Sequence, residues 1–269
     1  MSGQPEEGAG SLFFELAGDL RLSMLMKLSQ KQYRLSQIAI ELDATLQEAH
    51  RNILRLTDSG LVSKDNEGEL TLTPYGKIVI SLIPSYDFLF DQREYFLEHS
   101  LDKLPLKFIQ RIGALHNCEV VHGVMAILQR WKMLYNNSNK YIKEIMSQVP
   151  LDLIETISSR VQNGVRFSYI FASNAIIPKG RTQILHKIGW RNLISKGLVE
   201  RRMLNEVQIM TIFNEEQSCL MFPNLKGEPD LNIMFYSEDV EFHYWCEDFY
   251  EYMWEEAEAF DEAKLKPEV

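Results

Sequence analysis

The segment from Leu35 to Val62 constrains the fold of this chain most, because two helical repeats follow each other across a short gap. Apolar residues recur at helical spacing in two runs: Ile38, Ala39 and Leu42, then Ala49, Ile53 and Leu56. Gly60 ends the second run. The pattern predicts two short amphipathic helices that pack together, joined by a tight turn and followed by a strand.

The second helix is expected to begin at Thr45. Thr45 and Glu48 have the spacing of a capping box, in which the hydroxyl accepts a free backbone amide and the carboxylate reaches back to the helix start. The side of this helix opposite the apolar run then faces outward. It carries amide, imidazole and guanidinium groups, which can read base edges in a major groove: Gln47, His50, Arg51, Asn52 and Arg55.

A β-hairpin is predicted directly after Gly60. Two short runs, 61–64 and 69–72, flank Asp65-Asn66-Glu67-Gly68, a turn sequence that contains glycine. A helix-turn-helix followed by such a hairpin makes a winged helix.

Two short motifs carry a family resemblance. Residues 56–62 read LTDSGLV and residues 72–76 read LTPYG. Together they resemble the winged helix-turn-helix of bacterial and archaeal transcription regulators. The resemblance implies DNA binding, and the alternative is a winged helix that serves only protein contacts.

Seven residues are expected to contact DNA. Gln47, His50 and Arg51 would face bases, and Lys64 on the wing would face phosphate or the minor groove. Thr45, Asn52 and Arg55 would face bases or backbone. Residues 11–80 hold 8 Lys and Arg against 9 Asp and Glu, so the affinity of one copy for phosphate is expected to be modest. A homodimer that binds two half-sites of double-stranded DNA would compensate for the modest affinity of one copy.

The net charge of −10 comes from one region. Residues 238–262 contain 11 acidic and no basic residues, and without them the chain has 28 basic against 27 acidic residues, or +1. No apolar run has the roughly 20 residues that a membrane span needs, and residues 1–10 lack a signal-peptide pattern. The 3 cysteines are too few for a disulfide framework. A cytoplasmic protein that uses no cofactor and does not bind membranes is expected.

The fold class is expected to be α+β, in four regions. Residues 1–10 would form a flexible tail, 11–76 the winged helix-turn-helix, 77–115 connecting and dimerisation helices, and 116–269 an α/β effector-sensing domain. A single amphipathic helix is expected over 12–28, and Pro84 would kink the connecting helix. The alternative for that connecting helix is packing within one monomer.

The second half alternates helical and strand patterns. Helices are predicted at 119–135, 151–162, 182–196 and 240–260. Strands are predicted at 141–149, 165–172, 199–204, 207–213, 218–222 and 232–236.

The resemblance extends beyond the winged helix. Residues 96–115, the α/β half and residues 245–257, which read WCEDFYEYMWEEA, look like the archaeal regulators of the methanogenesis regulatory protein type. The match covers residues 12–260. It implies a dimeric archaeal regulator whose ligand-sensing domain is similar in fold to the phospholipase D superfamily.

An enzyme is not expected. Phospholipase D chemistry needs a nucleophilic histidine with a lysine two residues later, and no histidine of the chain has this neighbour; His186-Lys187 has the wrong spacing. A metal site is the next alternative, because His243 and Cys246 lie one helical turn apart. The apolar face around Cys246 favours a core cysteine instead.

An effector is expected near the carboxyl ends of the strands. Polar and cationic side chains gather there in the sequence, namely Ser173, Asn174, Arg181, Arg201, Arg202, Asn205 and Asn214. Arginines hold carboxylate or phosphate through paired donors, so the expected ligand is a small anion, with loop or surface roles as the alternative.

Overall fold

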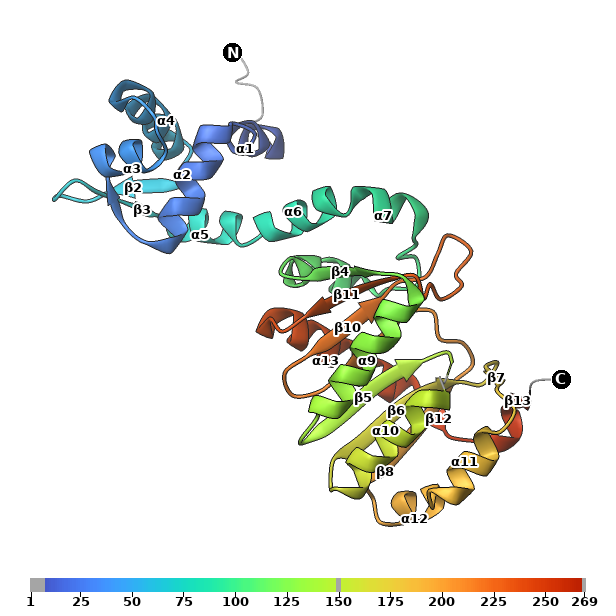
Figure 1. Cartoon of the computed structure of the whole chain (residues 1–269). Helices are drawn as coiled ribbons and strands as arrows, with labels where there is room; N and C mark the ends of the chain where they lie inside the picture. Colours follow the sequence, from blue (N-terminus) through green and yellow to red (C-terminus); the bar gives the residue numbers. More distant parts are fainter. Residues whose placement is uncertain (1–7, 149–150, 268–269) are drawn as a thin grey trace. The chain divides into compact units, whose positions relative to one another are not determined.

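The computed structural model describes residues 8–148 and 151–267, and it divides the chain into two compact units, Met1–Pro84 and Ser85–Val269 (Figure 1). Within the described ranges, no helix combines the length and the apolar character that crossing a bilayer requires. The fold is α+β, as expected.

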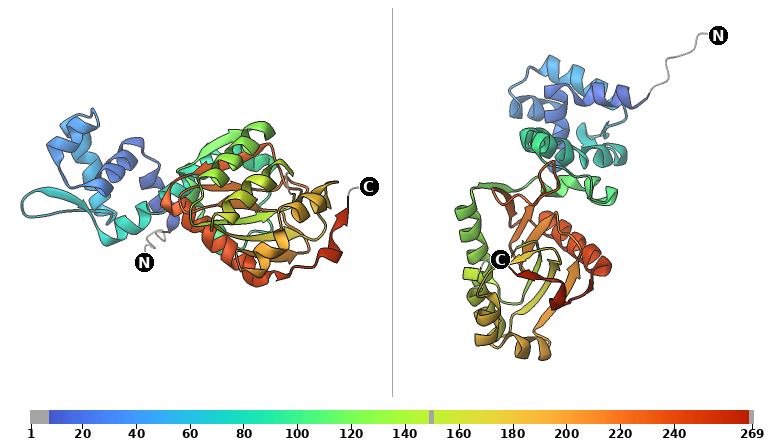
Figure 2. Two further views of the ribbon diagram at one scale, coloured as in Figure 1. Left: turned by 60° about the horizontal axis from the view of Figure 1, so that its bottom comes forward. Right: turned by 90° about the vertical axis from the view of Figure 1, so that its right-hand side faces the viewer.

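The first unit is a winged helix. Its helices are α1 (Ala9–Leu16), α2 (Asp19–Gln30), α3 (Leu35–Glu41), α4 (Leu46–Asp58) and α5 (Pro74–Ile80). Three short strands, β1 (Tyr33–Arg34), β2 (Val62–Lys64) and β3 (Glu69–Leu72), form an antiparallel sheet in the order β1-β3-β2. The two helices and the hairpin predicted between 35 and 72 are confirmed. Figure 2 shows the hairpin extending from the helices of this unit.

The expected single helix over 12–28 is wrong, because the chain breaks at Gly18 between α1 and α2. Arg21 explains the break. Its guanidinium donates to the backbone oxygens of Glu15 and Phe14 at 2.8 and 2.7 Å, so it satisfies carbonyls that α1 leaves open. A Cβ at Gly18 would lie 2.5 Å from the Arg21 guanidinium carbon, so a larger residue would require this guanidinium to shift.

Gly76 is required by a close backbone contact between α5 and the chain before β2. A Cβ at this position would lie 2.1 Å from the carbonyl oxygen of Leu61. Thr73 caps α5 by accepting from the Gly76 amide at 2.9 Å, and its hydroxyl also donates to the Gly60 oxygen at 2.6 Å. The motif at 72–76 therefore closes the wing onto the helical core.

The second unit is built on a sheet of eight strands in the order β12-β8-β6-β5-β9-β10-β11-β4. The strands are β4 (Glu119–His122), β5 (Tyr141–Met146), β6 (Arg166–Ala172), β8 (Val199–Leu204), β9 (Met210–Phe213), β10 (Ser218–Met221), β11 (Ile233–Ser237) and β12 (Glu258–Ala259). Strands β5, β6 and β8 are parallel, and the other pairings are antiparallel.

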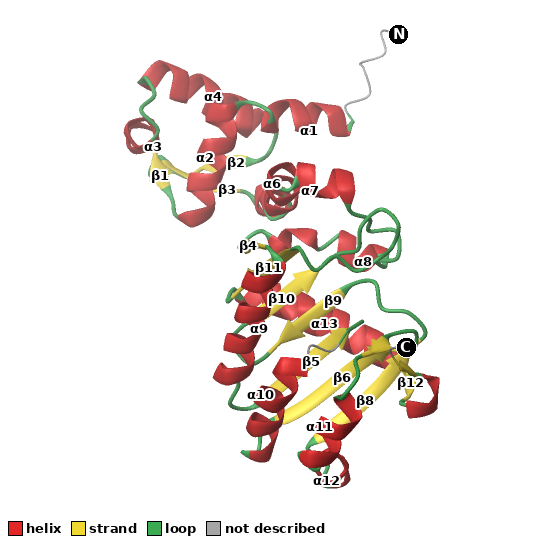
Figure 3. Ribbon diagram, turned by 45° about the vertical axis from the view of Figure 1, so that its right-hand side comes forward, coloured by secondary structure: helices red, strands yellow, loops and turns green. Residues whose placement is uncertain are grey.

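Helices cover both faces of this sheet. Figure 3 shows α9 (Val124–Asn137) and α10 (Leu151–Gln162) on one face and α13 (Val240–Glu256) on the other. Shorter helices α11 (Arg181–Lys187) and α12 (Trp190–Ser195) lie near β8. A separate two-stranded parallel sheet joins β7 (Ile176–Ile177) to β13 (Lys266–Pro267).

Three helix predictions in this unit are corrected. The helix expected at 240–260 ends at Glu256, and residues 258–259 form β12, which pairs with β8. Residues 119–135 were expected as one helix, but β4 pairs with β11 at the sheet edge and Gly123 turns the chain at φ 91° before α9. Residues 182–196 form α11 and α12, separated by Gly189 at φ 71°. Positive φ suits glycine, which has no Cβ to clash.

The expected connecting region, 77–115, is divided between the two cores. Val79 and Ile80 of α5 and Ile83 are buried in the first unit. Helices α6 (Ile83–Asp91), α7 (Arg93–Glu98) and α8 (Leu106–Ile109) and the 3-10 helix η1 (Ile112–Leu115) carry Phe88, Tyr95 and Phe108 into the second core. The expected flexible tail lies outside the described residues, apart from residues 8–10, and Ala9 and Gly10 begin α1.

We expect Gly76→Ala to destabilise the first unit by about 1–3 kcal/mol, because the new methyl group would overlap the Leu61 backbone. Gly10→Ala is the matched control, since a Cβ there meets no heavy atom within 4 Å. Urea unfolding of the full chain, followed by circular dichroism, measures both. Equal midpoints for the two variants would contradict the packing argument.

Glu144 of β5 gives the fold a pH dependence. Its carboxyl is buried and accepts from the Tyr135 hydroxyl at 2.8 Å, and burial raises its pKa from the ordinary 4.5 to about 7. The folded state therefore holds this proton more tightly than the unfolded chain does. The contribution of protonated Glu144 to the stability of the fold is complete below pH 4.5 and is lost as pH rises through 7.

We expect Glu144→Gln to remove this dependence, because glutamine accepts the same hydrogen bond without a charge. From pH 5 to pH 8, the unfolding free energy of the variant should rise by roughly 3 kcal/mol relative to that of the wild-type chain. Unfolding free energies at both pH values test this. A constant difference between the two proteins would rule out Glu144 as the group responsible.

Candidate functional site

Helix α4 is fixed at its start by the predicted capping box. The Thr45 hydroxyl accepts from the Glu48 amide at 3.2 Å and donates to Glu48 Oε2 at 2.7 Å, and the Thr45 amide donates to the same carboxylate at 3.1 Å. These bonds lower the pKa of Glu48. Both hydrogen-bonding roles of the Thr45 hydroxyl are therefore used inside the chain. Thr45 therefore fixes the start of the helix, and its expected contact with bases or backbone stays a prediction.

The outward face of α4 carries three of the predicted residues. Gln47, His50 and Arg51 are exposed, while Ala49, Ile53 and Leu56 on the opposite face are buried. Asn52 is half-buried, and its amide nitrogen donates to the Glu48 backbone oxygen at 2.9 Å. Leu54 also lies on the surface, with 48% of its side chain exposed. The face thus offers polar donors and acceptors beside one apolar group.

Arg55 forms an ion pair within the first unit that the sequence did not predict. Two nitrogens of its guanidinium, Nη2 and Nε, donate to the Glu15 carboxylate of α1 at 2.6 and 3.1 Å, and the group lies 5.2 Å from the Phe14 ring. The hydrogen bond from Arg55 is the main cause that lowers the pKa of Glu15. Arg55 therefore joins α4 to α1. Its expected contact with bases or the DNA backbone stays a prediction.

Salt bridges neutralise half of the basic residues between 11 and 80. Arg21 and Arg55 pair with Glu15, Lys27 pairs with Glu41, and Arg34 pairs with Glu69. In the described part of the chain, neither Arg51 nor Lys64 forms a salt bridge. The positive charges of these two residues are therefore available to bind another molecule.

The tip of the wing is acidic, a feature that the sequence reasoning overlooked. Asp65 Oδ1 accepts from the amides of Glu67 and Glu69 at 2.9 and 2.8 Å, so it shapes the turn. Glu67 is exposed next to it, and Lys64 is exposed at the end of β2. Because carboxylates flank Lys64, its attraction for phosphate is weakened.

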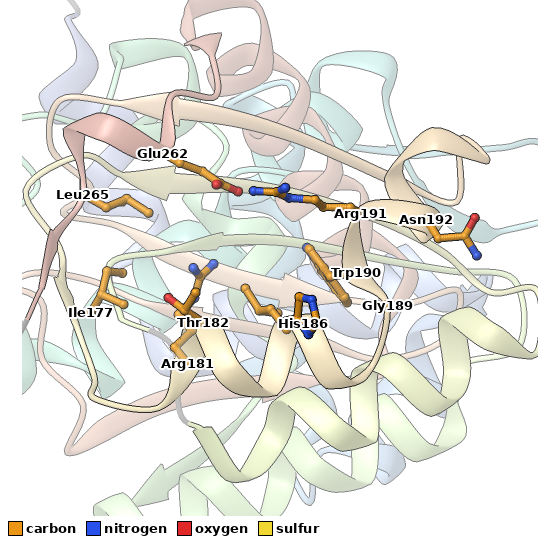
Figure 4. Close-up of a pocket in the computed structure, with 11 residues that line it drawn as sticks. Ile177, Arg181, Thr182, His186, Gly189, Trp190, Arg191, Asn192, Glu262 and Leu265 are labelled. Carbon is orange, nitrogen blue, oxygen red and sulfur yellow. The ribbon is translucent and has the colours of Figure 1, made fainter.

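In the second unit, the structure brings two of the predicted effector residues together. Arg181 and Arg201 lie near Tyr169 and Glu262, and Arg201 donates to Glu262 at 2.8 Å. Arg181 lines a cavity of about 570 Å³ between α11, α12 and the segment after β12 (Figure 4). Trp190, His186 and Glu262 also line it. Residue spacing could not predict this grouping, because Glu262 follows Arg201 by 61 positions.

Three of the other predicted effector residues, Arg202, Ser173 and Asn214, form hydrogen bonds within the chain. Arg202 donates to the Trp254 backbone oxygen at 2.6 Å, and the Ser173 hydroxyl donates to the Asn205 oxygen at 3.3 Å. Asn214 is buried, and its side chain bonds the backbone oxygen of Leu134, the Ser138 hydroxyl and two amides of the following turn. Asn174 is exposed.

His243 and Cys246 are part of the packing of α13. The His243 nitrogens lie 2.9 Å from the Ser218 hydroxyl and 3.1 Å from the Tyr141 hydroxyl, within hydrogen-bond distance. Cys246 is fully buried, and burial raises the pKa of its thiol to about 12. The preference for a core cysteine at 246 agrees with this burial.

Comparison with known proteins gives fold likeness only. No protein-family model matches the chain, and no curated protein matches it. Among solved structures, TrmBL2, described as an archaeal chromatin protein with a novel mode of DNA binding, aligns over 94% of this chain and 100% of its own, at 11% identity and a TM-score of 0.43. NucT from Helicobacter pylori aligns over 54% of this chain and 99% of its own, at 14% identity and a TM-score of 0.41.

A third solved structure is Nuc, a phospholipase D family member from Salmonella typhimurium. It aligns over 54% of this chain and 97% of its own, at 8% identity and a TM-score of 0.40. Because the scores are low, we base the functional proposal on the chain's own side chains.

Proposed function

We propose that this chain is a transcription regulator that binds double-stranded DNA through α4. The exposed face of that helix carries the proposal. Gln47, His50 and Arg51 stand on one side of a capped helix whose other side is buried. Amide and guanidinium groups in this arrangement can bond base edges in a major groove, and Leu54 offers an apolar contact for a thymine methyl group.

A homodimer is part of the proposal, because one copy has few free cations for phosphate. Arg51 and Lys64 are outside the salt bridges of the described first unit, and the wing tip is acidic. Two copies that bind two half-sites gain affinity through the linkage between them. The alternative is a winged helix that binds a protein, and the near-neutral charge of residues 11–80 favours that alternative.

We also propose that the second unit binds a small effector that controls DNA binding. The cavity beside Arg181 supports this proposal because its volume of about 570 Å³ falls in the usual range for ligand pockets. We place no catalytic role in the chain, since no histidine has the lysine two residues later that phospholipase D chemistry needs.

Selection of bound fragments from random duplex DNA tests the function first. The regulator proposal expects an enriched sequence, with retention that falls as salt is raised. A chain that retains no DNA even at low salt would support the protein-binding alternative.

We expect Arg51→Ala and Lys64→Ala to act differently on the selected sequence. Arg51→Ala should cost about 1–3 kcal/mol on that sequence and relax the choice of one base, because a base contact is lost. Lys64→Ala should weaken binding to selected and random DNA equally and lower the salt slope by about one. Arg166→Ala, an exposed arginine of the second unit, is the control. Fluorescence anisotropy measures all three. Equal losses for Arg51→Ala on both DNAs would contradict base reading.

We expect Glu67→Gln to strengthen binding to every sequence by about twofold at low salt, because it removes a negative charge near the phosphates. The gain should vanish at high salt, where such interactions are screened. Glu155→Gln, an exposed position on α10, is the matched control. Unchanged affinity of Glu67→Gln at low salt would show that the wing stays away from the DNA backbone.

A further inference from the structure

We propose that the cavity between α11, α12 and the C-terminal segment binds an organic dianion, whose charge meets Arg181 and whose apolar body lies against Trp190. This inference names the class of effector, and a regulatory role for the ligand rests on the proposed function. Ligand binding itself is measured without DNA.

The first support is a buried cation that lacks a carboxylate partner. Arg181 is only 7% exposed, yet it forms no salt bridge with any residue that the structure describes. Its Nε has no hydrogen-bond partner, and burial lowers the pKa of its guanidinium. A buried charge without a partner destabilises the fold, so such a group is retained where something else compensates it.

The second support is the chemistry of the unpaired atoms around Arg181. Trp190 Nε1 and the Tyr169 hydroxyl are also buried without a hydrogen-bond partner. Arg181 and Trp190 line the cavity, and with Tyr169 they line a space of about 30 Å³ next to it. All three side chains can donate a hydrogen bond. Arg181 and Trp190 can only donate, whereas the Tyr169 oxygen can also accept, and the Glu144 carboxyl lines the same small space. A phosphate or carboxylate beside Arg181 would supply a further acceptor for the unpaired donors.

The charge around the cavity indicates how many negative charges the ligand carries. Arg181, Arg191 and Arg201 all lower the pKa of Glu262, the carboxylate that lines the cavity. Figure 4 shows the Glu262 carboxylate directed toward the Arg191 guanidinium. Three guanidinium groups surround Glu262, and the Glu144 carboxyl that lines the adjoining small space is protonated below about pH 7, so an excess of two positive charges is present in that pH range. A dianion, either a phosphate monoester or a dicarboxylate, balances this excess.

Apolar side chains form the remaining wall. Ile177, Leu185 and Leu265 line the cavity together with the Trp190 ring. Inorganic phosphate alone would leave this wall uncovered, whereas a flat hydrocarbon body would cover it. The ligand is therefore expected to combine a dianionic group with an apolar or aromatic body.

Glu262 acts as an internal competitor for the ligand. It belongs to a short 3-10 helix, η2 (Glu262–Lys264), between β12, which pairs with β8, and β13, which pairs with β7. The neighbouring Phe260 ring lies 4.3 Å from the Arg201 guanidinium and 5.8 Å from the Tyr169 ring. A ligand anion that reaches Arg201 must replace the Glu262 carboxylate there, so ligand binding is linked to the position of this segment.

Calorimetry and thermal unfolding of the full chain test the site with four probes. The probes are 1-naphthyl phosphate, naphthalene-2,3-dicarboxylate, neutral 1-naphthol and inorganic phosphate. The two dianions should bind and raise the unfolding temperature, and 1-naphthol should not bind. Tighter binding of one dianion assigns the ligand to phosphate monoesters or to dicarboxylates. Absence of binding by both dianions, or equal binding of 1-naphthol, overturns the proposal.

Three variants separate a binding role from a structural one. Arg181→Met should raise the unfolding temperature of the free protein, because it removes an uncompensated buried charge, and should weaken dianion binding at least about tenfold. Glu262→Gln should tighten dianion binding. Arg166→Met, at an exposed arginine of the same unit, should change neither quantity. A lower unfolding temperature for Arg181→Met with unchanged dianion affinity would overturn the proposal.

DNA binding, measured in parallel, distinguishes the two possible failures. A chain that retains selected DNA but binds neither dianion overturns the cavity inference and leaves the DNA proposal standing. A chain that binds a dianion but no DNA supports the cavity and overturns the regulator.

Discussion

Burial of Ala49, Ile53 and Leu56 decides which side of α4 can meet another molecule. A helix that commits these positions to a core must present Gln47, His50 and Arg51 on its far side, because the helical period fixes both faces at once. The capping box sets where the helix starts, and the contact of Gly76 with Leu61 holds the wing against the same core. The candidate DNA surface is therefore a by-product of core packing.

Local patterns predicted the capping box and the hairpin correctly because the residues that interact there are close in sequence. The capping box joins positions three apart, and the hairpin at 62–72 joins neighbouring strands across one turn. The features that the sequence did not predict involve distant partners. Arg55 faces a carboxylate 40 positions away, and β4 becomes a strand through pairing with β11. No periodicity within residues 119–122 reveals that edge pairing.

The two candidate sites also differ in how much of each the sequence revealed. The exposed positions of α4 follow from helical spacing alone, so Gln47, His50 and Arg51 could be named from the sequence. At the cavity, Arg181 and Arg201 could be named as cations, but the carboxylate and the ring that define their surroundings could not. Glu262 and Trp190 reach the cavity through tertiary packing of α12 and the segment after β12.

The strand pairing of β12 has a practical consequence for engineering the chain. β12 covers the outer edge of β8, a strand that would otherwise present unpaired amides and carbonyls. Shortening the chain to end at Ala257 would expose that edge. It would also remove Glu262 and Leu265 from the lining of the cavity. Such a truncation would invite edge-to-edge aggregation, so purification tags and fusion partners are better placed before α1.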